Sequence, residues 1–125
     1  MIDITELSSR IETIERGYEY LLAYAAQGRQ DEQGSEARAR LTEMFAALNG
    51  LGELFAKVTI ASGAAPMVVG PFLDAVKQDA AKARAAIGLV LSRPTISSLL
   101  VDNLNASIHV RALLTDCFLV EQAFK

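Results

Sequence analysis

Apolar residues recur three and four positions apart in four stretches of the chain, which is the spacing of one face of an α-helix. The pattern predicts helices at about 3–27, 35–62, 71–92 and 95–124. Four helices of similar length with short links are typical of an antiparallel up-and-down bundle. We therefore expect an all-α fold, and specifically a four-helix bundle.

Two of these helices have features that bear on how they pack. Asn49 and Gly50 interrupt the second stretch, but its apolar seam continues across them, so we expect one continuous helix. From Val110 onward the last stretch is apolar on more than half of its circumference. A helix of that kind is buried on several sides, either within one chain or against a second copy.

Residues 58–73 contain two prolines, two glycines and no charged residue. Pro71 suits the first position of a helix, where its missing N–H is not needed. This assignment leaves residues 63–70 as a short apolar connector, able to form one helical turn. A bundle loop needs only polar turn residues, so this connector is expected either to cover the end of the core or to contact a second subunit or partner.

Composition and charge narrow the class of protein. The 125 residues are 51% hydrophobic and 22% charged, which fits one globular domain over 1–125. The net charge of −3 argues against a nucleic-acid partner or an anionic membrane surface. The N-terminus lacks the pattern of a signal peptide, and no apolar run reaches the length of a membrane span. A single cysteine allows no internal disulfide, so we expect a cytoplasmic protein.

The sequence offers little catalytic chemistry. His109 is the single histidine and lies on a polar stripe, so we expect it at the surface. Cys117 lies in an apolar seam beside Asp116, which favours a buried structural thiol over a nucleophile. Metal-binding, nucleotide-binding and nucleophile motifs are absent. We expect no catalytic residue, metal or cofactor, and we expect that the protein is not an enzyme.

The surplus of apolar surface favours a non-catalytic interaction protein, such as an adaptor, chaperone or regulatory subunit, acting as a homodimer or on a protein partner. The surface would come from the last helix and the connector. Its candidate residues are Met67, Val68, Val69, Leu100, Leu104, Arg111, Leu114 and Phe118.

The alternative is a sensor that holds a small apolar ligand between its helices. Small residues facing phenylalanines could leave room for one. The candidate pocket residues are Phe55, Phe72, Ala80, Ala83, Asn103 and Ala106.

Overall fold

The computed structural model describes residues 4–123, and over these residues the chain forms six helices and no strand. The prediction of an all-α fold is confirmed. The helices are α1 (Ile4–Ala25), α2 (Ala37–Leu48), α3 (Leu51–Ala61), α4 (Pro66–Leu91), α5 (Ser98–Ala106) and α6 (His109–Ala123).

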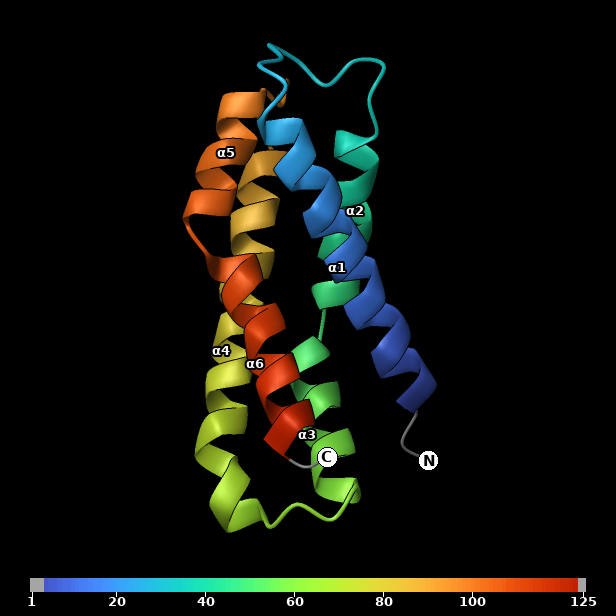
Figure 1. The fold of residues 1–125 in the computed structure, drawn as a ribbon, viewed down its shortest axis with the longest axis vertical. Helices are drawn as coiled ribbons and strands as arrows, with labels where there is room; N and C mark the ends of the chain where they lie inside the picture. The colour runs from blue at the N-terminus through green and yellow to red at the C-terminus, as the bar shows by residue number, and fades with distance from the viewer. Residues whose placement is uncertain (1–3, 124–125) are drawn as a thin grey trace.

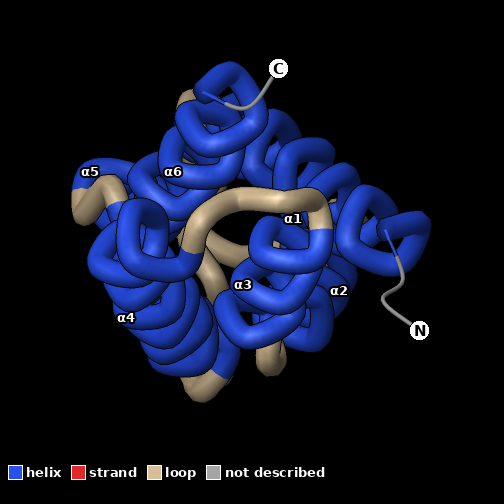
Figure 2. Tube along the Cα trace, turned by 90° about the horizontal axis from the view of Figure 1, so that it is seen from below, coloured by secondary structure: helices blue, strands red, loops and turns tan. Residues whose placement is uncertain are grey.

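The helices lie side by side along the long axis of the molecule (Figure 1). Helices α1 and α4 run toward one end, and α2, α3, α5 and α6 run toward the other. Loops 26–36 and 92–97 meet at the first end, which we call the upper end. At the opposite, lower end the connector 62–65 crosses between α3 and α4 (Figure 2).

The prediction of one helix over 35–62 is wrong, because α2 and α3 are separate helices bent by 50° at residues 49–50. Gly50 has a φ of +68°, a left-handed conformation that favours glycine. The carbonyl of Asn49, which the helix leaves without a donor, accepts a hydrogen bond from the Arg10 guanidinium at 2.6 Å. Gly50 was a signal for this break in the sequence, but the apolar seam that continues across it led to the prediction of one helix.

Gly52, just after the bend, allows α3 to approach α4 closely. A Cβ atom at this position would lie 2.6 Å from the Cα of Lys77. Only glycine, which has no Cβ, fits that distance. The close contact between α3 and α4 therefore lies directly after the bend and depends on Gly52.

The predicted start of the third helix at residue 71 is also wrong, because α4 begins five residues earlier, at Pro66. Pro66 occupies the first turn, where a missing N–H costs nothing. Pro71 lies inside the helix and removes one hydrogen bond, to the carbonyl of the exposed Met67. The connector is thus residues 62–65 rather than 63–70.

The last predicted helix, 95–124, is divided into α5 and α6 at residues 107–108, and its final residue lies outside the described residues. Ile108 has a φ of +62°, an uncommon conformation for a β-branched residue. The break changes which face of the preceding segment is buried. Val101 and Leu104 are buried in α5, whereas Leu99 is 69% exposed.

The hydrophobic core contains residues from all six helices. Within residues 4–123 no single helix has both the length and the apolar character to cross a membrane, although α2 and α3 taken together as a bent pair do. Several apolar residues of that pair, including Leu41, Met44 and Leu51, are buried in the core, whereas Ile60 is 43% exposed.

Candidate functional site

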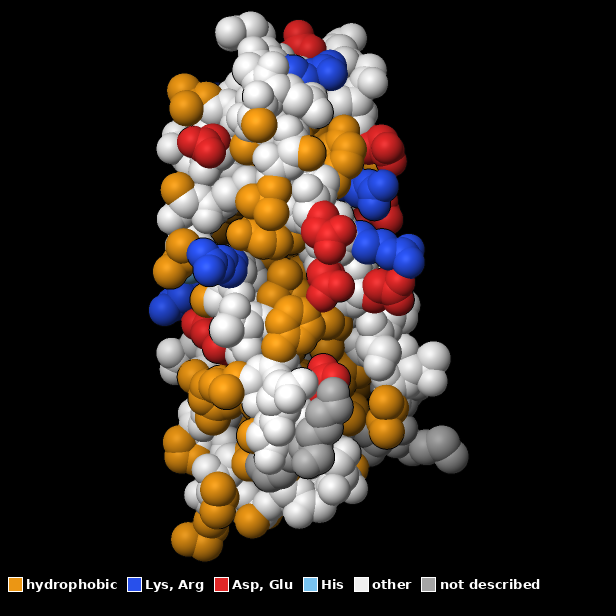
Figure 3. Space-filling view, viewed as in Figure 1, with side chains coloured by type: hydrophobic (Ala, Val, Ile, Leu, Met, Phe, Trp, Pro, Cys, Tyr) orange, Lys and Arg blue, Asp and Glu red, His pale blue; other side chains and the backbone are white. Residues whose placement is uncertain are grey.

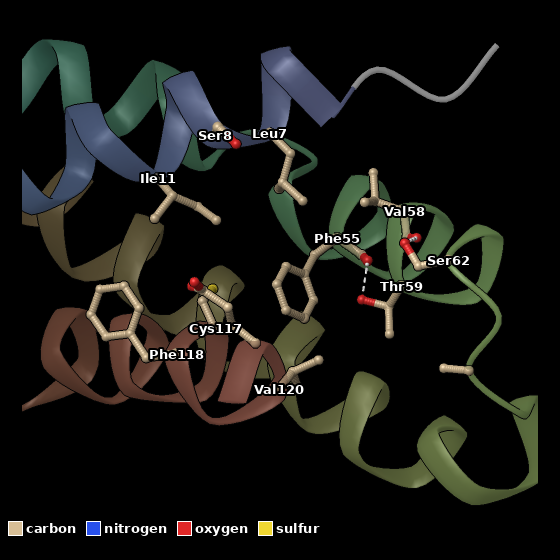
Figure 4. Close-up of a pocket in the computed structure, with 12 residues that line it drawn as sticks. Leu7, Ser8, Ile11, Phe55, Val58, Thr59, Ser62, Cys117, Phe118 and Val120 are labelled. Atoms are coloured by element: carbon tan, nitrogen blue, oxygen red, sulfur yellow. Dashed lines mark hydrogen bonds between the residues drawn. The ribbon is translucent and has the colours of Figure 1, made fainter. Parts of the chain in front are cut away.

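A pocket of about 330 Å³ opens between α1, α3 and α6 near the lower end (Figure 4). Its walls are mostly apolar. The lining residues are Leu7, Ser8 and Ile11 of α1; Phe55, Val58, Thr59, Ser62 and Ala64 of α3 and the connector; and Cys117, Phe118, Val120 and Glu121 of α6.

The three helices contribute different parts of the pocket. Leu7 and Ile11 are one turn apart on α1 and point toward α3 and α6 (Figure 4). The Phe55 ring, only 5% exposed, lies between the walls. The connector closes the lower side with Ala64, which is buried although its neighbours in the loop are exposed.

The pocket lies under a band of hydrophobic side chains that runs down one face of the molecule between α1 and α6 (Figure 3). Charged side chains of α1 border this band on the side away from α6. In the first turns of α1, Glu6 and Arg10 form an ion pair at 2.7 Å. The opening is therefore apolar at its centre and charged at one edge.

Cys117 lines the pocket but is poorly suited to nucleophilic chemistry. It is 3% exposed, which agrees with the expected buried thiol. Burial, and secondarily the negative charge of Asp116, raises the pKa of Cys117 to about 12. The side chain therefore stays a neutral thiol near pH 7, whereas the reactive form is the thiolate.

Behind Cys117, two carboxyl groups meet between α6 and α4. Burial, together with a hydrogen bond and the charge of Asp79, raises the pKa of Asp116 to about 7. Asp116 Oδ2 is buried, and the described residues provide no donor for it. A proton shared between the two carboxyl groups supplies that donor, and above pH 7 the groups repel each other.

The structure does not bring the six predicted ligand-pocket residues together. Phe55 lines the pocket described above, and Phe72 and Ala83 lie elsewhere, half-buried and buried in α4. Ala80 lines a second, more polar hollow beside the α2–α3 bend. Asn103 and Ala106 are exposed on α5, because the break at 107–108 turns that face outward.

The predicted partner surface is similarly divided. Three of its residues are buried in the core of the chain itself, namely Val69, Leu104 and Leu114, and Leu100 is half-buried. The exposed members are Met67, Val68, Arg111 and Phe118. Of these, Phe118 lines the pocket.

Most lining residues of the pocket were not identified from the sequence. Leu7, Ile11 and Val58 belong to the ordinary apolar seams of their helices, and nothing in the spacing marks them as facing a hollow. Thr59 carried a usable signal, because it is a polar residue at a position that continues the buried face of α3.

Within residues 4–123 no three His, Cys, Asp or Glu side chains come together in a way that could hold a metal ion. His109 is half-buried at the start of α6, and it is not among the residues that line the pocket.

No family model, no curated protein and no solved structure matches the chain.

Proposed function

We propose that the protein is a non-catalytic binding protein that holds a small apolar molecule between α1, α3 and α6. The observation that carries this proposal is the pocket of about 330 Å³. Its volume lies at the lower end of the range for small-molecule sites, and its lining of apolar side chains with a few polar groups is typical of them.

A non-catalytic role is supported by the chemistry of the lining residues. The one thiol in the pocket stays protonated near neutral pH, because burial raises its pKa to about 12. The one lining carboxyl group, Glu121, is exposed, and no imidazole or amine lines the pocket beside it. General acid–base or nucleophilic catalysis needs such a partner within hydrogen-bond reach.

The test is thermal denaturation with a panel of apolar and aromatic compounds. A ligand at a hundred times its Kd stabilises the folded state by about 2.7 kcal/mol and raises Tm by several degrees. We expect Ser8→Trp to abolish the shift, because Ser8 is exposed and lines the pocket. Ser9→Trp is the matched control, since Ser9 is exposed on α1 outside the pocket. No shift with any compound, or a shift retained by Ser8→Trp, contradicts the proposal.

A second function, self-association as an interaction protein, is favoured by one specific observation. Met67 and Val68, in the first turn of α4, are 94% and 75% exposed, while the next residue, Val69, is buried. Two adjacent large apolar side chains at an exposed helix end would be covered if they met their counterparts in a second copy of the chain. We propose a homodimer through this turn.

Light scattering of the double variant Met67→Ser and Val68→Ser tests the dimer. We expect the variant to be a folded monomer, because neither side chain is in the core. A wild-type protein that is already monomeric at high micromolar concentration removes this proposal and leaves the ligand proposal intact.

We also propose that the six helices form an antiparallel up-and-down four-helix bundle. In this arrangement α2 and α3 together make one interrupted helix of the bundle, and α5 and α6 together make another. The support is that each break spans two residues, 49–50 and 107–108, and that both helices of each pair run toward the same end of the molecule (Figure 1).

A further inference from the structure

Two of the three hydroxyl groups that line the pocket between α1, α3 and α6, those of Thr59 and Ser62, already donate to backbone carbonyls; the third belongs to Ser8. The Thr59 hydroxyl donates to the Phe55 carbonyl at 2.8 Å, and the Ser62 hydroxyl donates to the Val58 carbonyl at 2.8 Å. Each hydroxyl has one proton, so its remaining capacity is that of an acceptor. A ligand group that meets either oxygen must therefore donate.

The charge at the pocket has one sign. Glu121 is the one charged residue among those that line it, and no lysine, arginine or histidine is in that set. Its carboxylate is exposed and forms no ion pair with the described residues. An anionic ligand head would face this carboxylate with no cation among the described residues that line the pocket, whereas a cationic head would find a partner.

The helix ends around the pocket act in the same direction. Thr59 and Ser62 lie at the C-terminal end of α3, and Glu121 lies in the last turn of α6. The carbonyl-rich C-terminal end of a helix carries a partial negative charge. The start of α1 carries the opposite partial charge, and Glu6 in its first turn is paired with Arg10. Two helix C-termini and one carboxylate therefore give the site a preference for positive charge.

We propose that this pocket takes a small molecule with an apolar body and a protonated amine, the body against Phe55 and Ile11 and the amine at Glu121. This inference rests on the proposed function, since it names the ligand class of the same pocket. The hydroxyl oxygens of Thr59 and Ser62 accept from N–H groups of the ligand that enter more deeply.

The experiment compares three ligands that share one chain and differ in the head: octylamine, octanol and octanoate, each titrated calorimetrically below its aggregation range. We expect the amine to bind tightest and the carboxylate weakest. Glu121→Gln should weaken octylamine binding about three- to fivefold, the size of an exposed ion pair, and should leave octanol binding unchanged.

Asp102→Asn is the matched control, because it removes the same charge from an exposed position outside the pocket. It should leave the affinity for octylamine unchanged. An equal loss in both variants would assign the preference to the net charge of the protein and overturn the inference.

The outcomes also distinguish a failure of the apolar-ligand function from a failure of the amine preference. If none of the three compounds binds, the apolar-ligand function itself fails. If octanol or octanoate binds at least as tightly as octylamine, the pocket stands as a ligand site and the amine preference is overturned.

Discussion

The two ends of the molecule are held together in different ways. At the upper end, side chains connect segments that are distant in the sequence. The buried Tyr24 hydroxyl donates to the Ile96 carbonyl at 2.6 Å. The Ser98 hydroxyl donates to the Tyr24 carbonyl at 2.7 Å and accepts from the Arg29 amide at 2.9 Å.

A second set of polar contacts lies beside these at the upper end. Glu32 accepts from the Ile96 amide at 2.8 Å and pairs with Arg38 at 2.8 Å, and Arg38 also donates to the Leu91 carbonyl at 3.1 Å. The hydrogen bond from the Ile96 amide is the main reason that the pKa of Glu32 lies below its usual range. The polar loop 26–36 is thereby fixed to the loop 92–97.

The connector at the lower end is shorter and more apolar than the loops at the upper end. Even so, the lower end leaves more apolar surface exposed to solvent. Its 62–65 loop buries Ala64, but the turn that follows leaves Met67 almost fully exposed, and the pocket opens beside it. The comparison shows that polar loops can be the tightly bound parts of a small helical protein. Apolar residues in a loop do not by themselves make it part of the core.

The largest expected difference between the ends comes from two serines that both donate to backbone carbonyls. Ser98→Ala removes two hydrogen bonds at a site that is 2% exposed and leaves the Arg29 amide without its acceptor, although the Tyr24 carbonyl keeps the hydrogen bond from the Gln27 amide. We therefore expect a loss of about 3 kcal/mol in unfolding free energy. Ser62→Ala, at the exposed lower end, should cost less than about 0.5 kcal/mol. Urea denaturation measures both, and equal losses would remove the contrast between the ends.

The carboxyl pair of Asp79 and Asp116 predicts a pH dependence of stability. The pKa of Asp116 is about 7 in the folded protein against a usual value of 3.8, so between these values the folded state binds more protons than the unfolded state. Unfolding free energy should therefore fall as pH rises from about 4 to about 7, by on the order of 2 kcal/mol, and change little above 7 from this source.

Asp116→Asn tests this prediction, because an amide does not titrate. Urea denaturation at pH 5 and pH 7.5 should show a larger fall for the wild type than for the variant. An identical fall in both would assign the dependence to other groups.

The smallest expected effect concerns the break at 107–108 between α5 and α6. These two helices together run from the upper end to the lower end. Ile108→Gly should raise the unfolding free energy by about 1 kcal/mol, because glycine adopts the left-handed conformation at φ +62° without strain. Ile108→Ala keeps the Cβ and should not gain. Thermal or urea denaturation compares the two variants, and equal stability of both would show that the joint is unstrained.

The positions of the helices could be read from the sequence with good accuracy where caps and seams agree. Helix α1 ends at 25 against an expected 27, and α4 ends at 91 against an expected 92. The expected start of the first helix, residue 3, lies outside the described residues. The break at 49–50 had a local signal in Gly50. The break at 107–108 had none, because no residue there prefers a left-handed backbone.

By itself, the sequence determined an all-α chain, the C-terminal ends of α1 and α4 to within two residues, and the buried state of Cys117. These are properties of one helix at a time, since a 3.6-residue period specifies which side of a helix is apolar. Only the tertiary structure decided that Leu104 and Leu114 are buried in the core while Leu7, Phe55 and Phe118 surround a hollow. The reason is that a gap between helices depends on their crossing geometry, which the bends at 49–50 and 107–108 set and which the apolar period of any single helix does not contain.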